Sequence, residues 1–160
     1  VGIRGNVDSR VAKVAKGEVD AVVVAMAGLH RLGLQPPGFA LVEDVMLPAV
    51  GQGALSLEMR RGDNLAESVA ALDDPATRAE VTAERALLAG LRAGCAAPVG
   101  AHAVTAADTV RLAAAVLSHD GTQMYECVVS GGVANAADIG AEAARDLIGQ
   151  GAGRLLGENT

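Results

Sequence analysis

The sequence predicts two portions of different fold class, an α/β portion followed by a small α+β domain with a three-stranded antiparallel sheet and helices. Near the N-terminus, a helix pattern is followed by a continuous apolar run of strand length. In the second half, three strand patterns precede an amphipathic helix. Hydrophobic residues make up 51% of the 160-residue chain and charged residues 20%, so the chain has the composition of a globular protein.

The α/β portion is expected to begin with a helix and a buried strand. Asp8 or Ser9 can cap a helix with apolar residues at intervals of three and four, and Gly17 is expected to end it. Residues 21–27 are apolar throughout, which is typical of a strand covered on both faces of a parallel sheet. A short helix is expected over 28–34.

Prolines and glycines divide the segment that follows. Pro36-Pro37 excludes both a helix and a central strand. Gly51 and Gly53 lie beside an apolar stretch, where the backbone can bend sharply or pass close to a ligand. A strand is expected over 54–59 and a helix over 64–72.

The α+β domain is expected to open with a well-defined helix. Asp74 as N-cap and Pro75 at the first helical position are strong start signals. The helix is expected to run to about Arg92, with Gly94 as its C-terminal cap and Cys95 on the loop beyond it.

Three strands and a helix follow in this domain. Strands are expected over 99–106, 110–117 and 123–129, and Asp120-Gly121 is a good hairpin signal between the last two. The final helix is expected over 136–148. Its apolar face is predicted to consist of Ile139, Ala143, Leu147 and Ile148.

Composition excludes several function classes. The net charge of −6 and the single Phe, single Tyr and absent Trp do not suit a nucleic-acid binder. No apolar run reaches the roughly 18 residues that a membrane-spanning helix needs. The cysteine and histidine spacing predicts neither a metal site nor a disulfide framework. We expect a cytoplasmic protein that binds no nucleic acid, membrane or metal, and whose locally positive N-terminal segment can bind an anion.

Cys95 has two interpretations on position alone. Its small neighbours Gly94, Ala96 and Ala97 leave a thiol accessible as a nucleophile or attachment point. The favoured interpretation is nevertheless a small buried hydrophobe, because a helix C-terminus carries negative partial charge and disfavours a thiolate. Cys127, within an expected strand, is predicted to be a core thiol.

Four sequence segments, taken together, identify a family. They are Ile3-Arg4-Gly5-Asn6-Val7 with Arg10; Ala27-Gly28-Leu29-His30-Arg31-Leu32-Gly33; Leu47-Pro48-Ala49-Val50-Gly51-Gln52-Gly53-Ala54; and Glu84-Arg85-Ala86-Leu87 with Leu91 and Gly94-Cys95-Ala96-Ala97-Pro98-Val99-Gly100. Their content, order and spacing resemble the C-terminal half of the porphobilinogen deaminases, also called hydroxymethylbilane synthases. Ala93 and Ala97 depart from the family pattern, which usually has a glycine and a larger β-branched residue there.

The resemblance implies a transferase of porphyrin and haem biosynthesis. Such an enzyme condenses four porphobilinogen molecules, with loss of ammonia at each step, onto a dipyrromethane cofactor. The resemblance makes Cys95 the catalytic residue that carries this cofactor through a thioether. It also implies a monomeric full-length protein whose substrate is the small molecule porphobilinogen.

The resemblance also assigns the residues that bind the cofactor and substrate. Arg4, Arg10 and Arg31 match arginines that bind carboxylates, for which the planar guanidinium group is well suited. Secondary contacts are expected from Asn6, Ala27, Gly28 and Gln52.

The resemblance further implies how the chain is divided. Residues 1–43 match part of domain 2, one half of a periplasmic-binding-protein-like domain pair; 44–71 match a segment returning to domain 1 with a linker helix; and 72–160 match the C-terminal domain. We therefore expect an incomplete portion of the enzyme that is inactive by itself. A non-catalytic carboxylate-binding α/β module is the alternative, and a purely structural portion is a second one.

Overall fold

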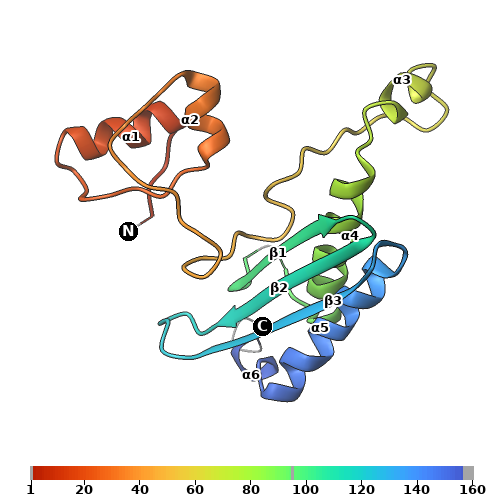
Figure 1. Ribbon diagram of the computed structural model, residues 1–160. Coiled ribbons are helices and arrows are strands. Elements are labelled where there is room, and N and C mark those ends of the chain that lie inside the picture. The colour runs from red at the N-terminus through yellow and green to blue at the C-terminus, as the bar shows by residue number, and fades with distance from the viewer. Residues whose placement is uncertain (1, 95, 157–160) are drawn as a thin grey trace. The chain divides into compact units, whose positions relative to one another are not determined.

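The computed structural model describes residues 2–94 and 96–156 (Figure 1). The chain divides into two compact units, Val1–Leu41 and Val42–Thr160. None of the helices in the described part of the chain is long and apolar enough to cross a membrane.

The first unit contains two short helices, α1 (Val7–Ala15) and α2 (Met26–Leu32). Helix α1 ends where predicted, because Gly17 adopts a φ of 70° and lets the chain leave the helix. Its predicted N-cap was wrong. Asn6 takes that position, and Asp8 lies inside the first turn, where its carboxylate accepts a hydrogen bond from the next amide.

The strand predicted over 21–27 does not form. Helix α2 begins at Met26, and residues 21–25 before it belong to no helix or strand. Val23 is 62% exposed, so this run is not buried on both faces. The described residues of the first unit contain no second strand with which it could pair, and a strand without a neighbour leaves its backbone groups unpaired.

The strand predicted over 54–59 is absent for the same reason. Leu55 and Leu57 are 86% and 62% exposed and belong to a segment that forms no helix or strand and has no sheet partner in the described chain. The following helix, α3 (Ala66–Ala70), lies within its predicted range but is shorter.

Helix α4 (Pro75–Gly90) begins as its sequence predicts and ends differently. The Asp74 carboxylate accepts a hydrogen bond of 2.7 Å from the amide of Thr77. At the other end, Arg92 adopts a φ of 52° and the amide of Ala93 donates to Leu88. This is a Schellman end, so Arg92 and not Gly94 occupies the left-handed position.

The three predicted strands are confirmed as one antiparallel sheet in the order β1-β2-β3, formed by β1 (Val99–Ala106), β2 (Thr109–Leu117) and β3 (Met124–Gly132). The predicted hairpin is also confirmed, since Gly121 has a φ of 70° and the amide of Ser118 donates to Gln123. A short 3-10 helix, η1 (Val133–Asn135), leads into α5 (Ala136–Gln150) and α6 (Gly153–Leu156).

Helices α4 and α5 lie side by side and pack on one face of the sheet, with the core between them (Figure 1). The largest fully buried side chains are Leu87, Leu112, Leu147, Val110 and Val116. The predicted apolar face of α5 is correct except for Ile148. That residue is 48% exposed, because it lies about 100° around the helix from buried Leu147.

Cys127 is a core residue, as predicted. It is buried on β3, and its thiol lies 3.7 Å from the carbonyl oxygen of Ala143 in α5. Burial, with a smaller contribution from the negative charge of Asp146, raises the pKa of the Cys127 thiol to about 11. This thiol therefore stays protonated at neutral pH.

Candidate functional site

The three arginines predicted to bind carboxylates lie in the first unit. Arg4 precedes α1, Arg10 lies within α1, and Arg31 lies in the last turn of α2. The Nε of Arg10 donates to the carbonyl oxygen of Gly5 at 2.8 Å, which orients its guanidinium group. Within the described residues, the exposed side chains of Arg4 and Arg31 make no hydrogen bond or ion pair. Both remain available to an anion.

The first turns of α1 and α2 contact each other. A Cβ built on Gly28 would lie 2.9 Å from Cγ2 of Val7, so only glycine fits this contact without a shift. Val7 directly follows Asn6, whose side chain makes no capping hydrogen bond. Ala27, beside Gly28, is exposed. The structure therefore brings Asn6, Ala27 and Gly28 to adjacent helix N-termini, where the backbone amides carry partial positive charge.

Gln52 lies on a tight turn in the second unit. Its amide donates to the carbonyl oxygen of Ala49 at 3.1 Å, and Gly51 has a φ of 72°. The sharp bend predicted at Gly51 is thus confirmed. A Cβ on Gly53 would meet nothing within 4 Å among the described residues, so the second glycine marks no close backbone contact there.

The segment before this turn pairs with the edge of the sheet. The amide of Ala101 donates to the carbonyl oxygen of Pro48 at 2.9 Å, and Ala49 forms an antiparallel bridge with Gly100. Gly100 permits this approach, because a Cβ there would lie 2.8 Å from the Cβ of Leu47. The turn that carries Gln52 is therefore attached to the first residues of β1.

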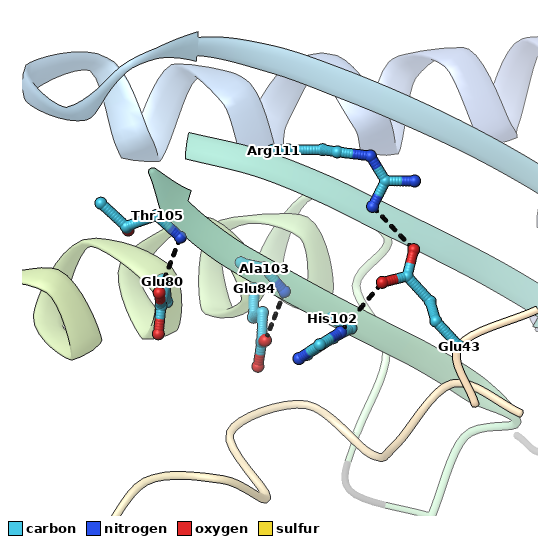
Figure 2. A network of polar contacts seen from close by, with 7 residues as sticks. All are labelled: Glu43, Glu80, Glu84, His102, Ala103, Thr105 and Arg111. Carbon is cyan, nitrogen blue, oxygen red and sulfur yellow. Dashed lines mark hydrogen bonds and ion pairs between the residues drawn. The ribbon is translucent and has the colours of Figure 1, made fainter. Parts of the chain in front are cut away.

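Two carboxylates of α4 cover the rest of this edge, and Figure 2 shows both reaching β1. Oε1 of the buried Glu84 accepts from the amide of Ala103 at 2.9 Å, and Oε2 accepts from the amide of Gly51 at 2.7 Å. Glu80, one helical turn earlier, accepts from the amide of Thr105 at 2.7 Å. Both carboxylates accept hydrogen bonds from backbone amides that would otherwise be unpaired at the edge of the sheet. Glu84 also accepts a hydrogen bond from the turn.

A third carboxylate connects the start of the second unit to the sheet (Figure 2). Oε1 of Glu43 accepts from Arg111 at 2.7 Å, and Oε2 lies 3.1 Å from Nδ1 of His102. The hydrogen bond from Arg111, and then that with His102, lowers the pKa of Glu43. Glu43 is therefore ionised at neutral pH and holds the segment before Leu47 against β1 and β2.

Cys95, predicted to carry the cofactor, lies outside the described residues, and that assignment stays a prediction. The chain on either side of it is held in place. The amide of Ala97 donates to Gly94 at 3.0 Å, and the amide of Leu117 donates to Pro98 at 3.0 Å. The second hydrogen bond attaches Pro98, the residue before β1, to the end of β2.

Sequence reasoning quoted Glu84 only as part of a motif and missed its contacts. A signal was available, because Glu80 and Glu84 recur at helical spacing among the small apolar residues Ala79 and Ala83. A carboxylate on the buried face of a helix requires hydrogen-bond donors. The pattern does not reveal that the donors are the backbone amides of distant residues.

Two family models match the chain. One, described as porphobilinogen deaminase, dipyromethane cofactor binding domain, matches residues 1–68, and the other, described as porphobilinogen deaminase, C-terminal domain, matches residues 78–149. The chain belongs to the porphobilinogen deaminase family. The resemblance inferred from the four sequence segments is thereby confirmed.

Curated members of this family are similar along nearly the whole chain. Porphobilinogen deaminase from Acidothermus cellulolyticus is 49% identical over 160 residues, covering 96% of this chain and 48% of the relative. That from Deinococcus radiodurans is 48% identical over 156 residues, covering 96% and 50%. Porphobilinogen deaminase 1 from Streptomyces avermitilis is 46% identical over 169 residues, covering 99% and 52%. The chain thus spans about half the length of the curated relatives it matches.

Proposed function

We propose that the complete polypeptide containing this chain is a hydroxymethylbilane synthase, which condenses four porphobilinogen molecules with loss of ammonia in porphyrin and haem biosynthesis. The observation that carries the proposal is the match of residues 1–68 to a dipyromethane cofactor binding domain. Within that range, two arginines have side chains free of partners in the described structure and two helix N-termini are adjacent. This arrangement suits a ligand that carries several carboxylates.

The residues of the first unit fit the chemistry of a pyrrole cofactor. Each pyrrole of dipyrromethane carries an acetate and a propionate, and Arg4, Arg10 and Arg31 supply positive charge that persists at any physiological pH. The adjacent N-termini of α1 and α2 add backbone donors, and the uncommitted amide of Asn6 adds a side-chain donor. The backbone at Ala27 and Gly28 belongs to the first turn of α2 and so lies at these same helix N-termini. In this proposal these groups bind and orient carboxylates, with a further contact from Gln52.

The assigned role of Cys95 is to anchor the cofactor through a thioether. When bound, dipyrromethane would supply the primer on which the pyrrole chain grows. The protein contributes the thiol of Cys95, which lies in the sequence between α4 and β1 with small residues on both sides. The described ends of this segment are fixed by the Schellman end at Arg92 and by the hydrogen bond from the amide of Leu117 to Pro98. Cys127 is not an alternative attachment site for the cofactor, because it is buried in the core.

The remaining assignments also belong to this proposal. Residues 1–43 would belong to domain 2 of a periplasmic-binding-protein-like pair, 44–71 would return to domain 1 with a linker helix, and 72–160 would form the cofactor-bearing domain. The exposed apolar residues Val23, Leu55 and Leu57 support this view, because strands in the rest of the polypeptide would cover them. The complete protein would be a cytoplasmic monomer, and this chain alone would be inactive.

Intact mass and peptide mapping test the proposal. The complete polypeptide should carry a dipyrromethane adduct on Cys95, consume porphobilinogen and form hydroxymethylbilane. Cys95→Ser should lose both the adduct and the activity. An adduct on Cys127, or an active enzyme with unmodified Cys95, would contradict the assignment. Carboxylate binding without any adduct or turnover would identify a non-catalytic binding module instead.

A further inference from the structure

The two edges of the three-stranded sheet differ in how their backbone groups are paired. On β1, three amides point away from β2, and each donates to an acceptor outside the sheet: Pro48, Glu84 or Glu80. Strand β3 forms the opposite edge (Figure 1). Among the described residues, its outward amides have no such acceptors. An edge strand with unpaired backbone groups is a surface to which another strand can bind.

The register of the β2–β3 ladder shows which groups of β3 face outward. The amide of Ser118 donates to Gln123, so hydrogen-bonded pairs in this ladder join even-numbered residues of β2 to odd-numbered residues of β3. The backbone N–H and C=O groups of Glu126, Val128 and Ser130 therefore point away from β2. Within residues 2–94 and 96–156, none of these three amides has a hydrogen-bond partner.

Strand β3 lacks the features that commonly protect an edge. Its nine residues include no proline and no lysine, and they pair with β2 in one continuous register without a bulge. Glu126 is the one charged residue of the strand, and Val128 is 57% exposed. The carbonyl oxygen of Glu126 accepts from Nε2 of Gln150 at 3.1 Å. A carbonyl oxygen has two lone pairs, so this bond still leaves room for a second donor.

The edge is complementary to a second copy of itself. In an antiparallel pair centred on Val128, the two Val128 side chains lie opposite each other, and Glu126 lies opposite Ser130 of the second copy. The Ser130 hydroxyl can then donate to the Glu126 carboxylate, and no like charges face each other. A pair centred on Glu126 would instead place two carboxylates opposite each other, which is destabilising. Charge thus favours the register centred on Val128.

We propose that this edge of β3 binds a second copy of the 160-residue chain, forming a two-fold symmetric dimer in the register centred on Val128. The inference is independent of the proposed function, and the monomeric state proposed above is that of the complete polypeptide. The two sheets join into one of six strands, with the helices of both copies on the same face. Because each copy contributes one strand, the interface is small, and the dimer is reversible and concentration-dependent.

The first test measures association of the 160-residue chain. Sedimentation equilibrium should show monomer and dimer, with the dimer fraction rising with concentration. Hydrogen exchange at the amides of Val128 and Ser130 should slow over the same range, whereas exchange at Ala101, which already donates to Pro48, should not change. A monomer at every concentration would overturn the proposal. Protection of the two β3 amides that does not depend on concentration would also overturn it, because the edge would then be covered within one copy.

The second test changes the charge at Ser130. Ser130→Lys places a cation opposite Glu126 of the second copy and should tighten the dimer about fivefold. Ser130→Glu places a carboxylate there and should weaken the dimer about fivefold. Within one copy, Ser130 lies opposite Arg111 across the β2–β3 ladder, so urea unfolding of the dilute monomer should find Ser130→Glu the more stable variant. Weaker association of this variant therefore cannot result from a less stable fold.

Ala106 provides the matched controls. It is exposed at the end of β1, on the sheet edge opposite β3. Ala106→Lys and Ala106→Glu introduce the same charges and should leave the dissociation constant at the wild-type value. Equal dissociation constants in the two Ser130 variants, or the same opposite shifts in the two Ala106 variants, would overturn the proposal, because association would then not depend on the pairing of Ser130 with Glu126.

Discussion

Gly140 of α5 lies directly against Ala83 of α4. The backbones of the two helices come so close that a Cβ at position 140 would overlap the carbonyl oxygen of Ala83 and lie 2.7 Å from the Cβ of Ala86. A second contact of the same kind joins Gly90 to Ala144. These small residues set the separation of the two helices on the sheet, and therefore the position of Glu84, which lies beside Ala83 in the chain.

Replacing Gly140 by Ala should destabilise the second unit strongly. The new methyl group meets backbone and not a flexible side-chain end, so the helices must separate, and overpacking of this kind costs about 3 kcal/mol or more. Gly149→Ala in the same helix is the matched control, because nothing lies within 4 Å of its Cβ. That change should stabilise the helix by up to about 1 kcal/mol. Urea unfolding of the two variants measures both effects, and equal stabilities would contradict the close approach at Gly140.

The second unit could be predicted from sequence because its partners are local. The three strands pair with their neighbours along the chain, β1 with β2 around a turn at Ala107-Asp108 and β2 with β3 around the Asp120-Gly121 turn. The run 21–27 has equally strong strand composition, yet it forms none, because no described strand of its unit lies beside it. Apolar content predicts that a segment will be buried. Whether it becomes part of a sheet depends on a neighbouring strand with which it can form hydrogen bonds.

The candidate site was only partly accessible from sequence. Residue patterns and family resemblance named the three arginines and Gln52, and the structure shows the turn of Gln52 and the contact of the α1 and α2 N-termini. The role of Glu84 could not be predicted, because its donors at Gly51 and Ala103 are far from it in the chain. A hydrogen bond from a backbone amide does not depend on the type of residue that donates it. The residue types at positions 51 and 103 therefore do not reveal these bonds.

Arg92→Gly should stabilise the second unit. Arg92 adopts a φ of 52°, a left-handed conformation that costs a residue with a Cβ roughly 1–2 kcal/mol and costs glycine far less. The gain is partly offset by the larger entropy of glycine in the unfolded chain, so we expect a net gain of about 0.5–1 kcal/mol. Thermal unfolding of wild type, Arg92→Gly and Arg92→Ala measures it, with Arg92→Ala expected to match the wild type. A lower stability of Arg92→Gly would contradict the Schellman end described above.

Cys127 should make stability fall at alkaline pH. Its folded pKa of about 11 lies above the ordinary thiol value of 9.0, so the unfolded chain loses its proton first. The contribution of the protonated, buried Cys127 thiol to the free energy of unfolding is therefore complete below about pH 9 and is lost as the pH rises toward 11. In a Cys95→Ser background, iodoacetamide at pH 8 should label no thiol in the folded protein and one after denaturation. Unfolding free energies at about pH 8 and about pH 10.5 should differ less in Cys127→Ala than in its parent. Rapid labelling of the folded protein would contradict the burial of this thiol.

The arginines of the first unit should be individually required for elongation in the complete polypeptide. Arg4, Arg10 and Arg31 are assigned to carboxylates, and each charge-assisted hydrogen bond contributes roughly 1.5–3 kcal/mol. Replacing any one by Leu should therefore lower the rate of porphobilinogen consumption by about tenfold to a hundredfold, since about 1.4 kcal/mol corresponds to a factor of ten. Replacement by Lys keeps the charge but loses the bidentate fork, so its effect should be smaller but measurable.

Arg145→Leu is the control, because Arg145 is exposed on α5 and bonds to its own helix at Ala141. Intact mass of each variant after a limited supply of porphobilinogen shows whether cofactor loading or chain extension is blocked. Wild-type rates in all three Leu variants, with Arg145→Leu also unchanged, would remove the carboxylate-binding role from these residues.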